Sequence, residues 1–198
     1  MKNNKKTLSV LVPCYNEEGN LQELVKRIHK VFDRLDIEGE LVLIDDASTD
    51  KTKEVIKELA LSKNYNIRAC FHDKNQGMFA SWGTALKAST GEYVCLIDAD
   101  LQNLPEDIAR LYEEILFSHA DIVQGVRSSI GRVKDSRFIF SRGLNLILNC
   151  LFLMRARDNK SGFIMTRRAV LTDVLSLRSS YYYPQTFIRI SAQKKAIE

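Results

Sequence analysis

Two aspartates one residue apart, Asp98 and Asp100, are the residues of this sequence best suited to chemistry. They follow an apolar run at residues 93–97, which predicts a buried strand. Residues i and i+2 of an extended chain point to the same side, so both carboxylates can reach one ligand. Carboxylates suit hard divalent cations such as Mg²⁺ or Mn²⁺. Phosphate oxygens of a ligand can complete the coordination shell of such a cation. The pair could also simply end a strand and solvate a loop, so its meaning depends on the rest of the chain.

The apolar pattern of the chain predicts the elements that must position these aspartates. Strands are predicted at residues 8–12, 40–44, 67–71, 93–97 and 122–125. Apolar residues at helical spacing predict helices at residues 21–35, 55–60, 79–88 and 108–116. This alternation predicts an α/β fold with a mostly parallel central sheet and helices on both faces. Ligands of such sheets bind beyond the carboxyl ends of the strands.

Polar segments separate the predicted elements. Pro13 closes the first strand, and a polar loop follows it. The second strand ends in a polar run at residues 45–50, in which Ser48 or Thr49 could cap the next helix. Residues 75–77, Asn-Gln-Gly, predict a turn.

Composition and charge narrow the class of protein. The 198 residues suit one domain, and 45% apolar with 27% charged residues is typical of a folded core. The net charge of +4 is mild and does not favour nucleic acid as a partner. Residues 127–168, however, carry ten Lys or Arg against two Asp, which suggests an anionic substrate or an anionic membrane surface.

The cysteines and the first residues of the chain suggest a cytoplasmic protein. All four cysteines lie in or beside apolar segments without metal-binding spacing, so we expect reduced core cysteines. Residues 1–6 are polar and do not form a signal peptide. The sequence contains no uninterrupted apolar run of about 18 residues, the length that a membrane span needs.

The last third of the sequence has a different texture. Residues 138–154 are apolar but interrupted by Arg142, which fits a helix at a membrane interface or, equally, a buried core helix. A short strand is expected near residues 162–165 and a helix near residues 170–177. The final residues form no closing element, so we expect a truncated chain.

Several stretches, taken in order, resemble the large inverting family of GT-A-fold nucleotide-sugar glycosyltransferases. These stretches are residues 12–17, 44–52, 75–77, 90–93 and 98–102. A narrower resemblance to the polyprenyl-phosphate branch, which includes dolichyl-phosphate mannosyltransferase and its bacterial undecaprenyl-phosphate relatives, rests on residues 98–106, 125–127, 141–143 and 158–163. The resemblance implies a single Rossmann-like GT-A domain over residues 1–198. Residues 7–127 would form its nucleotide-sugar and metal half, and residues 128–198 its acceptor and membrane-facing half.

The resemblance also implies roles for residues of the donor side. Pro13, Tyr15, Glu17 and Asp46 would bind the nucleotide, with Asp46 accepting the ring N–H of the base and Tyr15 lying against it. The alternative for Asp46 is helix capping.

The metal site follows from the same resemblance. Asp98 and Asp100 would be catalytic residues that hold Mg²⁺ or Mn²⁺ across the diphosphate. Gln102 would help to position the metal or the acceptor, and Ala99 would contact the substrate.

On the acceptor side, charge and the resemblance agree. A sugar hydroxyl needs a general base, but the sequence has no Asp or Glu between Asp173 and Glu198. A lipid phosphate is already ionised and instead needs cations. Arg127 as a catalytic residue and Arg142 as a binding residue would supply them. The resemblance is weaker near residues 185–187, where the branch often has a Glu. A later basic motif of that branch is also absent, so we expect that the chain could lack part of its acceptor site and be inactive alone.

We therefore expect a cell-envelope hexosyltransferase at the cytoplasmic face of the membrane. It would transfer a hexose or amino-sugar from a UDP- or GDP-sugar to a polyprenyl phosphate, with inversion and with a divalent metal. One alternative is transfer to a hydroxyl of a surface polysaccharide, and another is a catalytically silent nucleotide-binding module. A nucleotidyltransferase is less favoured, because the first strand is not followed by a glycine-rich phosphate loop.

Overall fold

A six-stranded sheet forms the centre of the computed structural model, which describes residues 7–125 and 162–176. The strands are β1 (Leu8–Cys14), β2 (Gly39–Asp45), β3 (Ile67–Phe71), β4 (Tyr93–Leu96), β5 (Ile122–Gln124) and β6 (Ile164–Arg167). The helices are α1 (Leu21–Leu35), α2 (Thr52–Leu61), α3 (Met78–Ala88), α4 (Asp107–Ser118) and α6 (Arg168–Ser176). The five strands and four helices expected before residue 126 are all present, as are the later strand and helix.

The strand order is β3-β2-β1-β4-β6-β5. The pairs β1–β2, β2–β3 and β1–β4 are parallel, whereas β6 runs antiparallel to both β4 and β5. The chain moves outward from β1 to β3 and then returns to the other side of β1 to form β4. This reversal is a topological switch point, where the loops after two neighbouring strands diverge and leave room for a ligand. The expectation of a mostly parallel sheet is confirmed.

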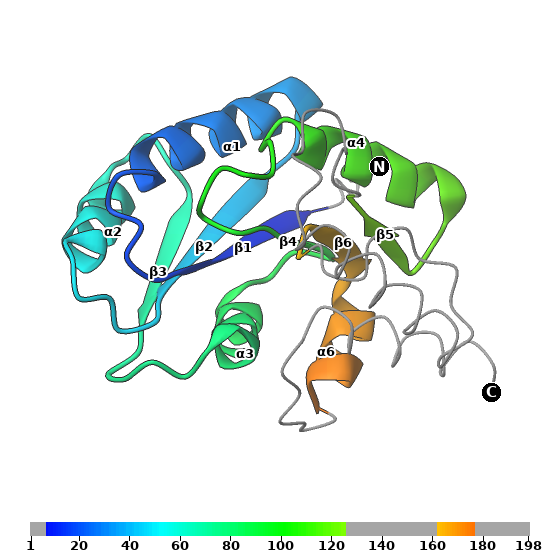
Figure 1. Cartoon of the computed structure of the whole chain (residues 1–198). Coiled ribbons are helices and arrows are strands. Elements are labelled where there is room, and N and C mark those ends of the chain that lie inside the picture. The colour runs from blue at the N-terminus through cyan, green and yellow to red at the C-terminus, as the bar shows by residue number, and fades with distance from the viewer. Residues whose placement is uncertain (1–6, 126–161, 177–198) are drawn as a thin grey trace, which may run out of the picture.

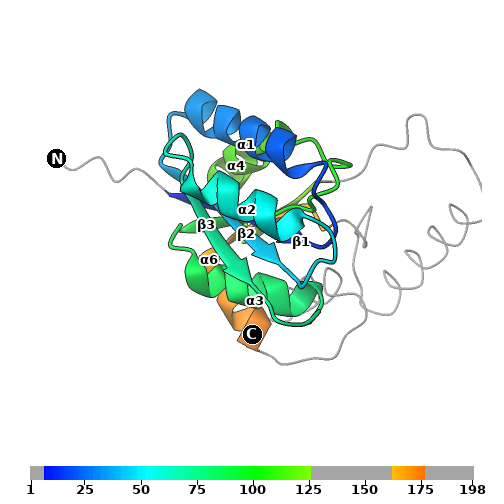
Figure 2. The same cartoon turned by 90° about the vertical axis from the view of Figure 1, so that its left-hand side faces the viewer.

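The sheet is covered on both faces, as expected. Helices α1, α2 and α4 lie on one face, and α3 and α6 lie on the other (Figure 1; Figure 2 shows the same layers after a quarter turn). Alternate residues of a strand feed the two faces. Thus Val10 and Val12 join the buried cluster beneath α1 and α4, while Leu11 joins the cluster around Trp82 of α3.

Pro13 lies inside β1, so the prediction that it closes the first strand at Val12 is wrong. It is paired in register with Ile44 of β2. Leu11 accepts the N–H of Ile97, so the polar groups of Leu11 and of Pro13, two residues on, point toward β4. β4 ends at Leu96, opposite Leu11, so no β4 residue lies beside Pro13. The missing N–H of proline therefore costs the sheet no hydrogen bond.

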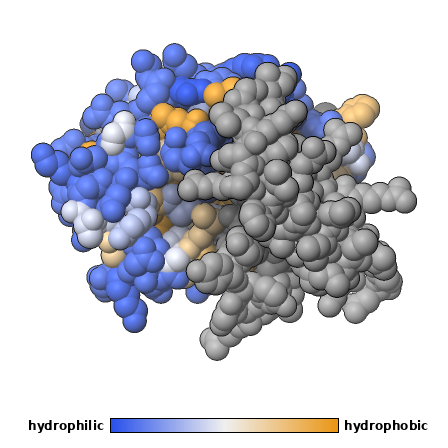
Figure 3. Space-filling model, in the orientation of Figure 1, coloured by the Kyte–Doolittle hydropathy of each residue, from blue (hydrophilic) through white to orange (hydrophobic). Residues whose placement is uncertain are grey.

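Within the described residues, the exposed large apolar side chains are Tyr15, Leu61, Leu104 and Phe117. Leu61 and Phe117 are the most exposed of them, and the described surface in Figure 3 is mostly hydrophilic. Among the described helices, none is long and apolar enough to cross a membrane.

Candidate active site

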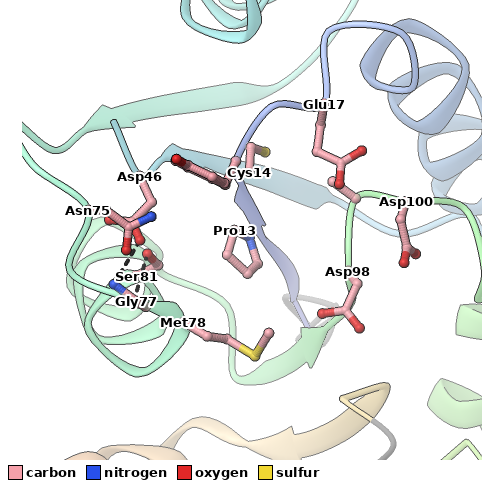
Figure 4. A pocket seen from close by; sticks show the side chains of 12 residues that line it. Pro13, Cys14, Glu17, Asp46, Asn75, Gly77, Met78, Ser81, Asp98 and Asp100 are labelled. Atoms are coloured by element: carbon pink, nitrogen blue, oxygen red, sulfur yellow. Dashed lines mark hydrogen bonds between the residues drawn. The ribbon is translucent and has the colours of Figure 1, made fainter. Parts of the chain in front are cut away.

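A pocket of approximately 370 Å³ lies at the carboxyl ends of β1 and β4, at the switch point of the sheet. It is lined by the end of β1 with the loop after it and by the segments that follow β2, β3 and β4. The lining residues are Pro13, Cys14, Tyr15, Glu17, Asp46, Asn75, Gly77, Met78, Ser81, Asp98, Ala99 and Asp100. Figure 4 shows Asp98 and Asp100 well apart from Asp46, with Pro13 between them in this view. The pocket therefore has two acidic sides, one formed after β4 and one after β2.

Most of the donor-side residues expected from sequence meet in this pocket. Pro13, Tyr15, Glu17 and Asp46 line it. So do Asp98, Ala99 and Asp100.

Gln102 does not line the pocket, and two further expected residues are not among those that the structure describes. Gln102 is exposed and is not a lining residue, although its backbone N–H donates to Asp100 Oδ1 at 3.0 Å. Arg127 and Arg142 lie outside the described residues. The roles of all three stay predictions.

Sequence reasoning missed the side of the pocket that α3 supplies. Asn75, Gly77, Met78 and Ser81 line the pocket from the loop before α3 and from its first turn. The Asn-Gln-Gly stretch gave a signal for this side, since it belongs to the resemblance and also predicts a turn. Met78 and Ser81 gave none, because their spacing is equally typical of a buried helix face.

Left-handed backbone at residues other than glycine marks three of the loops around the pocket. Asn16, Ala47 and Leu101 follow β1, β2 and β4 and have φ angles of 58°, 61° and 59°. Such angles are uncommon for residues other than glycine and concentrate at functional sites. After Leu101 turns, Asp100 Oδ1 accepts the N–H of Gln102, which forms an Asx turn and fixes the carboxylate at the end of the loop.

The loops after β1 and β2 are joined by reciprocal hydrogen bonds. Asn16 N donates to Ser48 Oγ at 3.0 Å, and Thr49 N donates to Asn16 Oδ1 at 2.8 Å. One residue further on, Glu17 N donates to Thr52 Oγ1 at 2.7 Å. These bonds fix the backbone that carries Tyr15 and Glu17 at the pocket.

The prediction that Ser48 or Thr49 caps the following helix is wrong. The residue at the N-cap of α2 is Lys51, and Asp50 Oδ1 accepts the N–H of Thr52 at 2.9 Å. Ser48 and Thr49 are instead used to bind the neighbouring loop. Hydroxyl residues suit both roles, so local sequence cannot separate them.

Asp46 also has a contact that sequence did not indicate. Its Oδ1 accepts the N–H of Gln76 at 2.9 Å, and its Oδ2 accepts the N–H of Gly77 at 2.8 Å. Gly77 is the N-cap of α3 with φ 81°, a conformation that favours glycine. Asp46 therefore does not cap the helix that follows it, but holds the loop before α3 against the pocket.

The chemistry of the donors fits a hard divalent cation. Asp98, Asp100 and Glu17 present carboxylate oxygens to the pocket. The pocket is also lined by the thiol of Cys14, which is buried. Burial raises the pKa of this thiol, so it stays protonated and does not act as a thiolate ligand. Within residues 7–125 and 162–176, no three His, Cys, Asp or Glu side chains form a metal cluster. A cation held by Asp98 and Asp100 would therefore depend on further oxygen ligands, such as those of a diphosphate.

The Thr-Gly-Glu stretch at residues 90–92 has a structural role far from the pocket. Buried Glu40, near the start of β2, accepts hydrogen bonds from Ser9 Oγ at 2.7 Å, Gly91 N at 3.1 Å and the backbone N–H of Thr90. Arg68 Nε donates to its other oxygen at 2.9 Å. This network joins the amino ends of β1, β2 and β4, the opposite end of the sheet from the pocket.

One of the basic residues expected to attract an anion, Arg168, instead makes structural hydrogen bonds. Arg168 donates to Gly91 O at 2.6 Å, Leu86 O at 2.9 Å and Ser89 Oγ at 2.7 Å. It thus ties the end of α3 to the turn before β4. The three cysteines within the described residues, Cys14, Cys70 and Cys95, are free, as expected.

This sheet, with its pocket at the switch point, is the GT-A fold. A solved structure of glucosyl-3-phosphoglycerate synthase from Mycobacterium tuberculosis, with Mn²⁺, UDP-glucose and phosphoglyceric acid, matches 85% of this chain and 59% of its own, with a TM-score of 0.66 and 22% identity. The S. aureus TarS structure matches 94% of this chain and 55% of its own, with a TM-score of 0.58 and 21% identity.

The family follows from the sequence match. The family model described as "Glycosyl transferase family 2" matches residues 9–175, and the chain belongs to this family. Undecaprenyl-phosphate 4-deoxy-4-formamido-L-arabinose transferases are similar to it. The Pseudomonas fluorescens protein is 34% identical over 187 residues, which are 93% of this chain and 52% of that protein. The Edwardsiella ictaluri protein is 30% identical over 189 residues, 96% and 56% of the two chains. The chain thus spans about half the length of these relatives.

Proposed function

We propose that this protein transfers a sugar from a nucleoside-diphosphate sugar to a polyprenyl phosphate, with inversion at the anomeric carbon. The observation that carries the proposal is the pocket at the switch point, where Asp46 lies on one side and Asp98 with Asp100 on the other. Family membership and the undecaprenyl-phosphate transferases among the relatives support the reaction class.

The base of the donor is assigned to the Asp46 side of the pocket, and its diphosphate to the side of Asp98 and Asp100. Tyr15 is half exposed at the pocket and offers an aromatic face to a base, while Asp46 offers a hydrogen-bond acceptor to its ring N–H. Asp98 and Asp100 would hold Mg²⁺ or Mn²⁺ together with the diphosphate. When bound, the cation neutralises the charge that develops on the leaving nucleoside diphosphate. Glu17, whose Oε2 accepts an N–H of Asn20 at 2.7 Å, borders the same end of the pocket.

The acceptor attacks without a protein base. An ionised phosphate oxygen forms a bond to the anomeric carbon as the bond from that carbon to the diphosphate oxygen breaks, and no proton is transferred. Arg127 and Arg142, outside the described residues, are the side chains proposed to hold the acceptor phosphate. The basic composition of residues 127–168 supports work at the cytoplasmic surface of an anionic membrane.

The test is product formation from defined substrates. The chain is incubated with Mn²⁺, undecaprenyl phosphate in lipid vesicles, and UDP- or GDP-linked hexoses, amino-sugars and 4-deoxy-4-formamido-arabinose. Mass spectrometry then identifies the product. A sugar attached to the lipid phosphate, absent when EDTA is added, is the expected result. A product formed only on an added sugar hydroxyl would show that the acceptor is a hydroxyl and not a polyprenyl phosphate. Nucleotide binding without any turnover would favour a silent binding module.

A further inference from the structure

Behind Asp46 lies a buried histidine whose two ring nitrogens are both engaged. His72 Nδ1 lies 2.7 Å from Asp46 Oδ1, and His72 Nε2 lies 2.9 Å from Thr84 Oγ1. His72 follows β3 and Thr84 belongs to α3, so the contact joins three separate segments. His72 is only 8% exposed and does not line the pocket.

The chemistry of the three groups fixes the direction of one hydrogen bond. An ionised carboxylate only accepts, so Nδ1 of His72 must carry the proton that it donates to Asp46. The Thr84 hydroxyl can donate or accept a hydrogen bond. It can therefore pair with Nε2 of His72 whether or not this nitrogen carries a proton. Thr84 therefore holds the ring in place, and the ring holds the carboxylate.

The carboxylate of Asp46 has one acceptor position left for a ligand. A carboxylate offers about four lone-pair positions, two on each oxygen. Oδ1 of Asp46 uses two, for Gln76 N and His72 Nδ1, and Oδ2 uses one, for Gly77 N. The position that remains is on Oδ2, and Asp46 lines the pocket. One N–H of a ligand can therefore be accepted there.

We propose that His72 is a positioning residue for recognition of the donor's base, an inference that rests on the proposed function. By occupying Oδ1, His72 leaves Oδ2 as the oxygen offered to the ligand. This arrangement selects nucleoside diphosphates whose base has a ring N–H on its pairing edge, as uracil and guanine have. Cytosine has no such ring N–H, and its diphosphate would lack this contact.

Two amide substitutions separate the nitrogens of the ring. In His72→Asn the amide nitrogen can occupy the place of Nδ1 and donate to Asp46, whereas in His72→Gln it can reach only the place of Nε2 beside Thr84. Both variants are neutral and polar, so each controls for the other. Calorimetric titrations of the whole chain with UDP, GDP and CDP in the presence of Mn²⁺ measure the effect.

The wild-type chain should bind UDP or GDP more tightly than CDP. His72→Gln should weaken the preferred nucleotide by about tenfold, the usual effect of one hydrogen bond to a charged group, and leave CDP unchanged. His72→Asn should stay within about twofold of the wild type for all three nucleotides. Equal losses in the two variants, or an equal loss for CDP, would mean that His72 only supports the fold.

A measurement on the unmodified chain covers the case in which the variants do not fold. The Nδ1 proton of His72 should give a protected NMR resonance that moves when the preferred nucleotide is added. A missing resonance, or one unmoved at saturation, overturns the inference. Base-selective binding with that result would leave the proposed function intact, whereas no nucleotide binding by the wild type would refute both.

Discussion

Asn16 Oδ1 accepts both the backbone N–H of Thr49, at 2.8 Å, and its hydroxyl, at 3.2 Å, across 33 residues of sequence. This one amide oxygen fastens the loop after β1 to the loop after β2, and so fixes two sides of the pocket relative to each other. Asn16 also has a φ of 58°, which asparagine tolerates better than most residues. Asn16 does not line the pocket itself, but it positions the neighbouring residues Tyr15 and Glu17, which do.

Asn16→Ala should lower the free energy of unfolding by about 1–2 kcal/mol and weaken nucleotide binding severalfold, since Tyr15 loses its fixed backbone. Asn16→Gly removes the same hydrogen bonds but accepts the left-handed backbone. It should weaken binding equally and destabilise less. Urea unfolding and calorimetry measure the two effects. A pair of variants with unchanged affinity would show that the loops hold together without this residue.

Asp100→Asn should lower the Mn²⁺-dependent part of nucleotide affinity by about tenfold or more, because a charged oxygen ligand is lost. Stability should change little, since an asparagine oxygen can still accept the N–H of Gln102. The matched control is Glu58→Gln on the exposed face of α2, which removes one negative charge elsewhere. Titrations with Mn²⁺ and with EDTA make the comparison. If Asp100→Asn kept the full metal dependence, the assignment of the cation to this loop would be wrong.

Gly91→Ala should destabilise the fold by about 1–3 kcal/mol, the cost of overpacking. A Cβ at residue 91 would lie 2.5 Å from Ser9 Oγ and 2.6 Å from Ser9 N. Gly83→Ala is the control, because nothing lies within 4 Å of a Cβ there, and alanine in a helix should stabilise by about 0.5–1 kcal/mol. Denaturant midpoints distinguish the two. Similar midpoints would mean that the turn before β4 can relax.

Glu40 should make the fold sensitive to acid. Burial opposes ionisation of this carboxyl, but hydrogen bonds from Ser9, Thr90 and Gly91 outweigh it and hold its pKa below the ordinary value. A group with a depressed folded pKa stabilises above its unfolded pKa, and this stability is lost as pH falls through the folded pKa.

Glu40→Gln should therefore cost about 2 kcal/mol near neutral pH, and its difference from the wild type should shrink below about pH 4. Urea unfolding at a series of pH values measures this difference. A constant difference across the series would show that the charge of Glu40 contributes nothing to stability.

The sequence alone determined the alternation of strands and helices, because apolar periodicity is local and survives in any fold that buries those faces. It also placed Asp98 and Asp100 correctly at the pocket, since a carboxyl end of a parallel strand meets the ligand edge in every such sheet. The loops that carry the family resemblance could also be recognised from sequence, because each is a short run of polar residues that are consecutive in the chain.

Only the tertiary structure decided which partner each polar side chain takes. It inserted β6 antiparallel between β4 and β5, assigned Ser48 and Thr49 to a neighbouring loop, and joined Asp46 to His72. It also gave the Thr-Gly-Glu stretch to a buried network around Glu40 rather than to the pocket. The hydrogen bonds among these pairings link residues separated by 26 to 51 positions in the sequence. A hydroxyl or carboxylate can satisfy several partners, and chain folding determines which of them comes within hydrogen-bond distance.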